Sequence, residues 1–190
     1  MTGAEKDVET IESIFERKSK ADVWFTQATE FLTDSWILGF GENVGSCGAD
    51  EFVTGNYIRN FQSWMMFQVA DGLQTSQSPI GNIWTSAYYH IRMLNVFIEN
   101  VGNVYDLTVE EKKNWKAEAM AVKAFFYFEL VRRYGPIVLV PENIDVNVDL
   151  AEMQVPRSHV DTCFNEIVRL LNDAIPDLYT SKESSYINCS

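Results

Sequence analysis

The amino-acid sequence predicts an all-α protein built from antiparallel helix pairs, and two observations carry that prediction. Glycine and proline are few, with 10 and 5 in 190 residues, below their average usage of about 7% and 5%. Apolar residues recur at intervals of three and four along several windows, which is the spacing of one face of a helix. The length suits one domain or slightly more.

The first third of the chain is predicted to hold helical segments on either side of a long loop. Residues 5–33 have helical spacing with a break near Ser19, because the interval from Ser19 to Asp22 suits the start of a second helix. Residues 33–57 contain five glycines among polar residues and predict a long surface loop. Residues 58–71 form a short apolar element that we expect to be helical.

Two longer helices are expected in the middle of the chain. Residues 80–101 keep the spacing of a buried stripe and should close at Gly102, where a left-handed residue commonly ends a helix. Residues 109–134 form the best-specified helix, because Thr108 and Glu111 have the spacing of a capping box. This helix is apolar on two faces, so we expect it to lie between neighbours.

The remainder of the chain predicts one more helix after an extended segment. Gly135-Pro136 should end the preceding helix, and residues 137–141 are rich in β-branched residues and read as extended. The last helix should begin at Ser158, whose spacing to Asp161 suits an N-terminal cap, and it should stop at Pro176. The helix pairs predict tetratricopeptide-like stacking, although no repeat carries that consensus in full.

Composition and charge exclude several classes of protein. The formal net charge is −12, so the clustered lysine and arginine needed to bind nucleic acid or anionic lipid are missing. No run of apolar residues approaches the 18 or more that suggest a membrane-spanning helix. Three cysteines form no even framework of disulfides. The first residues contain no apolar stretch typical of a signal peptide.

The sequence offers no constellation of catalytic or metal-ligating residues. His90 and His159 are the only histidines and belong to no metal-binding motif. Cys163 lies on the apolar stripe of a helix, where cysteine serves as a small hydrophobic residue. We therefore expect no catalytic residue, no metal and no cofactor, and we expect the protein not to be an enzyme.

Aromatic residues are the remaining unusual feature, with 12 Phe, 8 Tyr and 5 Trp. Most lie on helical stripes and are expected in the core. The aromatic residues in or beside the glycine-rich loop belong to no clear stripe. They lie among Asn, Asp and Gln side chains, a combination that suits a sugar, whose apolar face stacks on a ring while its hydroxyls hydrogen-bond. The alternative, in which these rings fold back to fill the core, stays open.

Three blocks of residues, in order, resemble one known family. The first runs Trp84-x-x-x-Tyr88-x-x-Ile91-x-x-x-Asn95. The second, residues 118–139, contains Arg-Arg-Tyr-Gly-Pro, and the third starts at Pro156-Arg-Ser158 and runs to residue 178. Together they resemble the N-terminal region of the SusD/RagB family, which are outer-membrane nutrient-binding lipoproteins of Bacteroidetes.

The resemblance implies a fold and a role. The fold would be α-helical with tetratricopeptide-like helix pairs, and residues 1–190 would be the N-terminal part of that domain, with the polar tail 180–190 at a truncation point. The role would be capture of a glycan, or sometimes a peptide, at the cell surface. The cargo would pass to a SusC-like, TonB-dependent outer-membrane transporter. The lipid-anchoring cysteine of the family is absent from this chain, so the membrane anchor is implied only by the resemblance.

The candidate ligand-binding residues follow from position and chemistry within residues 36–68. Trp64 is the candidate for stacking on a sugar ring, with Trp36 as a second plane. Asp50 and Asn56 are candidates for hydrogen bonds to hydroxyls. Asn95 is instead expected to be a satisfied amide in the core. Two alternatives to glycan capture are retained: a peptide-capturing member of the same family, and a helical-repeat module that binds another protein and no sugar.

Overall fold

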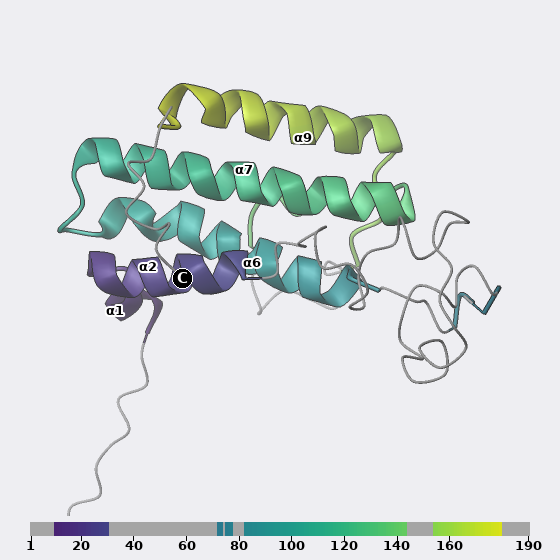
Figure 1. Ribbon diagram of the computed structural model, residues 1–190, viewed down its shortest axis with the longest axis horizontal. Coiled ribbons are helices and arrows are strands. Elements are labelled where there is room, and N and C mark those ends of the chain that lie inside the picture. Colours follow the sequence, from purple (N-terminus) through teal and green to yellow (C-terminus); the bar gives the residue numbers. More distant parts are fainter. Residues whose placement is uncertain (1–9, 31–71, 74, 78–81, 144–153, 180–190) are drawn as a thin grey trace, which may run out of the picture. The chain divides into compact units, whose positions relative to one another are not determined.

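The computed structural model describes residues 10–30, 72–73, 75–77, 82–143 and 154–179 (Figure 1). All the regular elements within these ranges are helical, which confirms the predicted all-α class. The elements in order are α1 (Ile11–Ile14), α2 (Lys18–Thr29), α6 (Trp84–Asn100), the 3-10 helix η1 (Val101–Asn103), α7 (Val109–Tyr134), α9 (Val160–Ala174) and the 3-10 helix η2 (Ile175–Asp177).

The chain divides into two compact units, one comprising Met1–Phe31 with Ala87–Ser190 and the other Leu32–Ser86. The first unit holds α1, α2, α7, α9 and most of α6. The predicted loop 33–57 and the apolar element 58–71 lie outside the described residues.

The break between the first two helices falls earlier than predicted. Helix α2 begins at Lys18, so Ser19 lies in its first turn and does not cap it. The residue before it, Arg17, supplies no side-chain cap either. The backbone N–H of Lys18, which has no acceptor within the helix, donates to Asp106 Oδ1 at 2.6 Å, a partner 88 residues away. Because this cap comes from a distant loop, a local sequence window does not contain it.

The predicted boundaries of α7 are confirmed and the predicted end of α6 is wrong. Thr108 Oγ1 accepts from the N–H of Glu111 at 3.2 Å, and the Glu111 carboxylate accepts from the N–H of Thr108 at 2.8 Å, which completes the capping box. Gly135 ends α7 with φ of +68°, a conformation that favours glycine. Gly102 does not adopt a left-handed conformation, because the chain continues past Asn100 into the 3-10 helix η1.

Helix α9 begins two residues later than predicted. Its cap is His159, whose Nδ1 accepts from the N–H of Asp161 at 3.3 Å. The predicted cap, Ser158, is used differently, since its N–H donates to the carbonyl oxygen of Ile137 at 2.7 Å. Pro176 lies in η2 directly after the helix, as a stop signal should.

Aromatic contacts join α2, α6 and α7 around a common core. The ring of Phe97 on α6 lies 4.9 Å from that of Phe25 on α2 and 6.1 Å from that of Trp115 on α7, measured between centroids. His90 on α6 stacks on Phe126 of α7 at 5.6 Å. Figure 1 shows α7 running alongside α9, with which it makes an extensive interface. The side chains of α7 are accordingly buried on two faces, as predicted.

Candidate functional site

An extended segment, residues 137–143, crosses between the helices of the first unit, and we call it the strap. Two tyrosines supply the hydrogen bonds that a neighbouring strand would give. Tyr88 Oη donates to the carbonyl oxygen of Val138 at 2.7 Å and accepts from its N–H at 3.0 Å. Tyr127 Oη does the same for Val140, with both distances 2.9 Å. Successive residues of an extended segment point in opposite directions, so the two tyrosines bind alternate residues of the strap, Val138 and Val140.

Both phenols remain protonated over the whole physiological range. Burial raises the pKa of Tyr88 to about 12, because the charged phenolate is poorly solvated there. The pKa of Tyr127, which is fully buried, is raised for the same reason. Each hydroxyl therefore keeps the proton that it donates to the strap.

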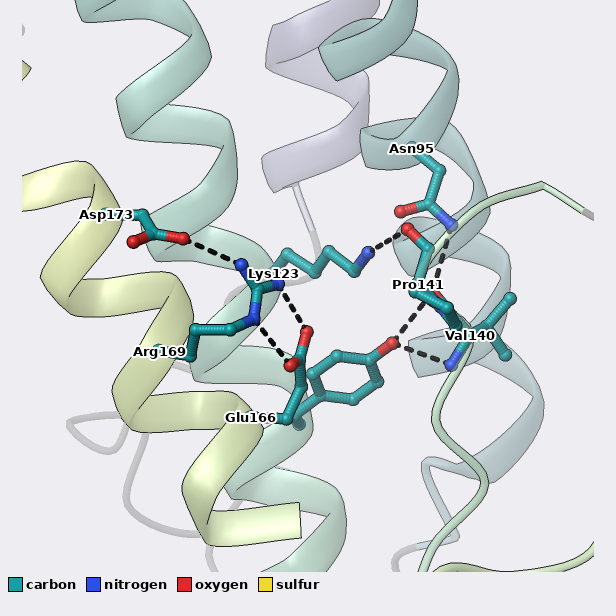
Figure 2. Close-up of polar contacts among 8 residues, drawn as sticks. Asn95, Lys123, Val140, Pro141, Glu166, Arg169 and Asp173 are labelled. Carbon is teal, nitrogen blue, oxygen red and sulfur yellow. Dashed lines mark hydrogen bonds and ion pairs between the residues drawn. The ribbon is translucent and has the colours of Figure 1, made fainter. Parts of the chain in front are cut away.

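The strap forms one side of a groove with a volume of about 510 Å³, and helices α6, α7 and α9 form the others. This size is within the range of about 300–1,000 Å³ typical of small-molecule sites. Figure 2 shows side chains from all three helices and the strap gathered there. The lining residues are Asn95, Ile98 and Glu99 of α6, Lys116, Met120 and Lys123 of α7, Pro141 and Glu142 of the strap, and Arg169 and Leu170 of α9.

Lys123 and Asn95 hold consecutive carbonyl groups of the strap (Figure 2). Lys123, only 2% exposed, donates from Nζ to the carbonyl oxygen of Pro141 at 2.9 Å. Asn95, also 2% exposed, donates from Nδ2 to the carbonyl oxygen of Val140 at 3.2 Å. Within the described part of the chain its Oδ1 accepts no hydrogen bond, so the expectation of a satisfied core amide holds for only one end of the side chain.

Burial lowers the pKa of Lys123 to about 8. Loss of hydration penalises the ammonium form, and Arg169 adds a smaller repulsion, while Glu166, Glu99 and Glu142 act in the opposite direction. The ammonium also lies 5.8 Å from the centroid of the Tyr127 ring.

Two of the other charges around the groove have partners of their own. Arg169 makes two hydrogen bonds to Glu166, at 2.7 and 2.8 Å, and one to Asp173 at 2.7 Å, and the bonds to Glu166 are the main reason that its pKa is raised. Glu99 accepts from Asn143 Nδ2 at 3.1 Å.

The four predicted ligand-binding residues, Trp64, Trp36, Asp50 and Asn56, all lie outside the described residues. They therefore stay predictions. The groove was not found from the sequence, although one signal for it is visible there. Lys123 stands between Val122 and Ala124 in the middle of a helix that is apolar on two faces, and a cation at such a position needs a polar partner from elsewhere in the fold.

Metal-ligating residues do not gather within the part of the chain that the structure describes, where no group of three or more His, Cys, Asp and Glu side chains could hold an ion. His90 Nδ1 instead lies 3.1 Å from the carbonyl oxygen of Ala28. Cys163 is fully buried, as predicted for a small hydrophobic residue. Among the described helices, none is long and apolar enough to cross a membrane.

Several solved structures of similar fold are SusD-like proteins. A SusD-like protein of Bacteroides fragilis matches with a TM-score of 0.74 and 18% identity, over 98% of this chain and 34% of its own. A laminarin-binding SusD-like protein matches with a TM-score of 0.68 and 18% identity, over 86% of this chain and 34% of its own. A SusD superfamily protein of Parabacteroides distasonis matches with a TM-score of 0.60 and 23% identity, over 88% and 36%.

These likenesses identify the fold, which confirms the predicted SusD-like arrangement of helices. The chain spans about a third of the length of these structures. None of the curated proteins matches it. The family model SusD-like_3, described as starch-binding and associating with the outer membrane, matches residues 40–188. Since that match covers well over half of the sequence, the chain belongs to the SusD-like family.

Proposed function

We propose that the chain is part of a cell-surface glycan-binding subunit of a nutrient uptake complex. It captures an oligosaccharide or polysaccharide at the outer membrane and passes it to a SusC-like, TonB-dependent transporter. The observation that carries the proposal is the match of residues 40–188 to a family described as starch-binding. A protein of similar fold is named as laminarin-binding, so a glucan is a reasonable first ligand to test.

The proposed role is to bind the glycan without catalysing a reaction on it. Capture requires a rigid frame that presents recognition residues, and hydrogen bonds from Tyr88 and Tyr127 fix the strap against α6 and α7. Of the polar residues that line the groove, Asn95 and Lys123 are bound to backbone carbonyls and Arg169 is bound to Glu166. None of them forms the paired nucleophile and base that hydrolysis by an enzyme would need.

The recognition residues proposed are those predicted from the sequence. The indole of Trp64 stacks on the apolar face of a sugar ring, and Trp36 provides a second plane. Asp50 and Asn56 hydrogen-bond to the hydroxyls, which sets the specificity among glycans that all stack equally well.

Tryptophan fluorescence of the full-length mature protein, titrated with laminarin, starch and a panel of other purified glycans, tests the proposal. A saturable change with one class of glycan is expected. Trp64→Ala should then weaken that binding about fivefold or more, because stacking of one ring contributes on the order of 1 kcal/mol or more. Trp64→Phe, which keeps an aromatic plane, should retain most of it.

The same titration separates the alternatives. Binding of a glycan with unchanged affinity in Trp64→Ala would reject the assigned residue and keep the function. No change in fluorescence with any glycan of the panel would reject glycan capture. A peptide library and co-purification with a β-barrel transporter would then decide between peptide capture and a protein-interaction module.

A further inference from the structure

Lys123 is a buried cation that has no counter-ion within ion-pair distance among the described residues. Its side chain is 2% exposed, and its one hydrogen bond is to a neutral acceptor, the carbonyl oxygen of Pro141. Across the described ranges no carboxylate lies within ion-pair distance of Nζ. Buried charges in proteins are almost always paired, because removing an ammonium from water is costly. Two of the three N–H groups of this ammonium are therefore free to bind an anion.

Asn95 places an unused acceptor beside that cation. Its Oδ1 is buried and accepts no hydrogen bond from any residue that the structure describes. Figure 2 shows this oxygen on the side of the amide that faces Lys123, while Nδ2 points to Val140. Lys123 and Asn95 are bound to the consecutive residues Pro141 and Val140 and both line the groove, so this donor and this acceptor belong to one site. A buried polar atom without a partner calls for an explanation, and a ligand is one.

Both side chains line the groove, and its remaining surfaces suit a small molecule with an apolar side and a charge. Lys116, about two helical turns from Lys123 on α7, is exposed and has no ion pair among the described residues. The apolar lining comes from Ile98, Met120 and Leu170. The lining contains three basic residues and the two acidic residues Glu99 and Glu142. Arg169 is already paired with Glu166 and Asp173, so Lys116 and Lys123 are the basic residues of the lining that have no ion pair among the described residues.

We propose that this groove is a second ligand site, which binds a small hydroxylated carboxylate of the sugar-acid class. The carboxylate pairs with the ammonium of Lys123, and Lys116 attracts it from the rim. A hydroxyl of the same molecule donates to Asn95 Oδ1. The apolar face of the sugar ring rests on Ile98, Met120 and Leu170. A neutral sugar satisfies Asn95 and leaves Lys123 without a counter-ion, so the site should discriminate in favour of the acid.

The proposed site uses none of the residues assigned to surface capture, so the two proposals fail independently. Loss of polysaccharide binding in Trp64→Ala has no bearing on this groove. Loss of sugar-acid binding in a variant of the groove likewise leaves polysaccharide capture untouched.

Calorimetric titration of the full-length protein with sodium D-glucuronate and with D-glucose, at equal ionic strength, tests the inference. Saturable binding of glucuronate and at least tenfold weaker binding of glucose are expected. Lys123→Met, which keeps the length of the stem, should weaken glucuronate binding at least tenfold, and Lys116→Met should weaken it a few-fold. Lys113→Met is the matched control on α7, because Lys113 is exposed and lies outside the groove, and it should bind as the wild type does.

Proton uptake on binding gives a second readout that does not depend on any variant. A carboxylate beside Lys123 raises its pKa from about 8, so at pH 8 the complex should take up to about half a proton per glucuronate. Repeating the titration in buffers of different ionisation enthalpy measures this number. The other charged groups that face Lys123 are Glu166 and Arg169 of α9, Glu99 of α6 and Glu142 of the strap. Arg169 stays protonated at pH 8, because its hydrogen bonds to Glu166 raise its pKa.

Three outcomes would overturn the inference. Equal affinity for glucose would show that no anion is recognised. Unchanged glucuronate binding in correctly folded Lys123→Met would place any site elsewhere. Binding by the wild type with no proton uptake at pH 8 would show that the carboxylate does not reach Lys123.

Discussion

The hydroxyl of Tyr127 lies between the N–H and the carbonyl oxygen of Val140, at 2.9 Å from each. One side chain on α7 thus satisfies both backbone groups of a residue in the strap. Tyr88 on α6 does the same for Val138. The strap has the backbone of a strand and its partners are tyrosine side chains from two helices. This arrangement attaches an extended segment to an all-α frame and closes one side of the groove.

Tyr127→Phe should destabilise the protein by about 1–3 kcal/mol, because the N–H of Val140 loses its partner in a buried position. The carbonyl oxygen of Val140 keeps its bond from Asn95, so the cost should be in the lower part of that range. Urea unfolding measures the difference. Tyr89→Phe is the matched control, since Tyr89 is 61% exposed, and it should change the free energy of unfolding by less than about 0.5 kcal/mol. Equal effects of the two substitutions would contradict the role given to Tyr127.

Lys123 should make the stability of the protein depend on pH in the alkaline range. The pKa of Lys123 is about 8 in the folded state against an ordinary value of 10.5. Between pH 8 and 10.5 the unfolded chain therefore binds more protons than the folded one, and stability attributable to this residue rises with pH. Below pH 8 the full penalty of burying the ammonium is present in the folded state.

The measurement is urea unfolding of the wild type and Lys123→Met at pH 7, 8, 9 and 10. The free energy of unfolding of the wild type should rise relative to that of the variant as the pH rises, by on the order of 3 kcal/mol at most. Taking the difference cancels the other groups that titrate in this range. A difference that stays constant from pH 7 to 10 would mean that the pKa of Lys123 is not lowered.

Glu111 should contribute stability that is lost in acid. Its carboxylate accepts from Lys18 Nζ at 2.7 Å and from the N–H of Thr108 at 2.8 Å, and these bonds, the one from Lys18 first, lower its pKa to about 2. A lowered folded-state pKa gives stability above the ordinary value of 4.5 that disappears as the pH falls to about 2.

Thermal unfolding of Glu111→Gln tests this dependence on pH. The variant should have a lower Tm than the wild type at pH 7, and the gap should close as the pH approaches 2. Glu110→Gln, one residue away and outside the capping box, should show a smaller gap at pH 7. Raising the salt concentration should narrow the gap for Glu111→Gln, because the bond to Lys18 is exposed to solvent.

Gly135 and Gly102 should respond in opposite directions to substitution by alanine. Gly135 has φ of +68°, which strains any residue with a Cβ, although no atom lies within 4 Å of the position that a Cβ would take. Gly135→Ala should therefore cost about 1–3 kcal/mol through the backbone alone. Gly102 has an ordinary backbone and open space, so Gly102→Ala should be neutral or stabilise by up to about 1 kcal/mol. The denaturant midpoints of the two variants test this prediction. A Gly135→Ala variant as stable as the wild type would contradict the backbone strain assigned to this position.

Local signals in the sequence predicted the helices that carry their own caps. Thr108 and Glu111 fix the start of α7 and Gly135 fixes its end, and all three lie within a few residues of the boundary they set. The start of α2 was predicted at the wrong residue, since the N–H of its first residue, Lys18, is bound by Asp106 from a distant loop. The prediction that Gly102 ends α6 in a left-handed conformation was also wrong, because the chain continues from α6 into η1.

The sequence by itself determined the helical class and the most strongly specified helix, because apolar periodicity and capping are properties of neighbouring residues. The family followed from the resemblance of three ordered blocks of residues, which the family match over residues 40–188 confirms. Only the tertiary structure decided how the strap is held and what surrounds Lys123. The partners of the strap come from Tyr88, Asn95 and Tyr127, which are 50, 45 and 13 residues from the groups they bind. The lowered pKa of Lys123 likewise arises from burial. Burial and long-range hydrogen bonds exist only once the helices have packed, so no local pattern of residues encodes them.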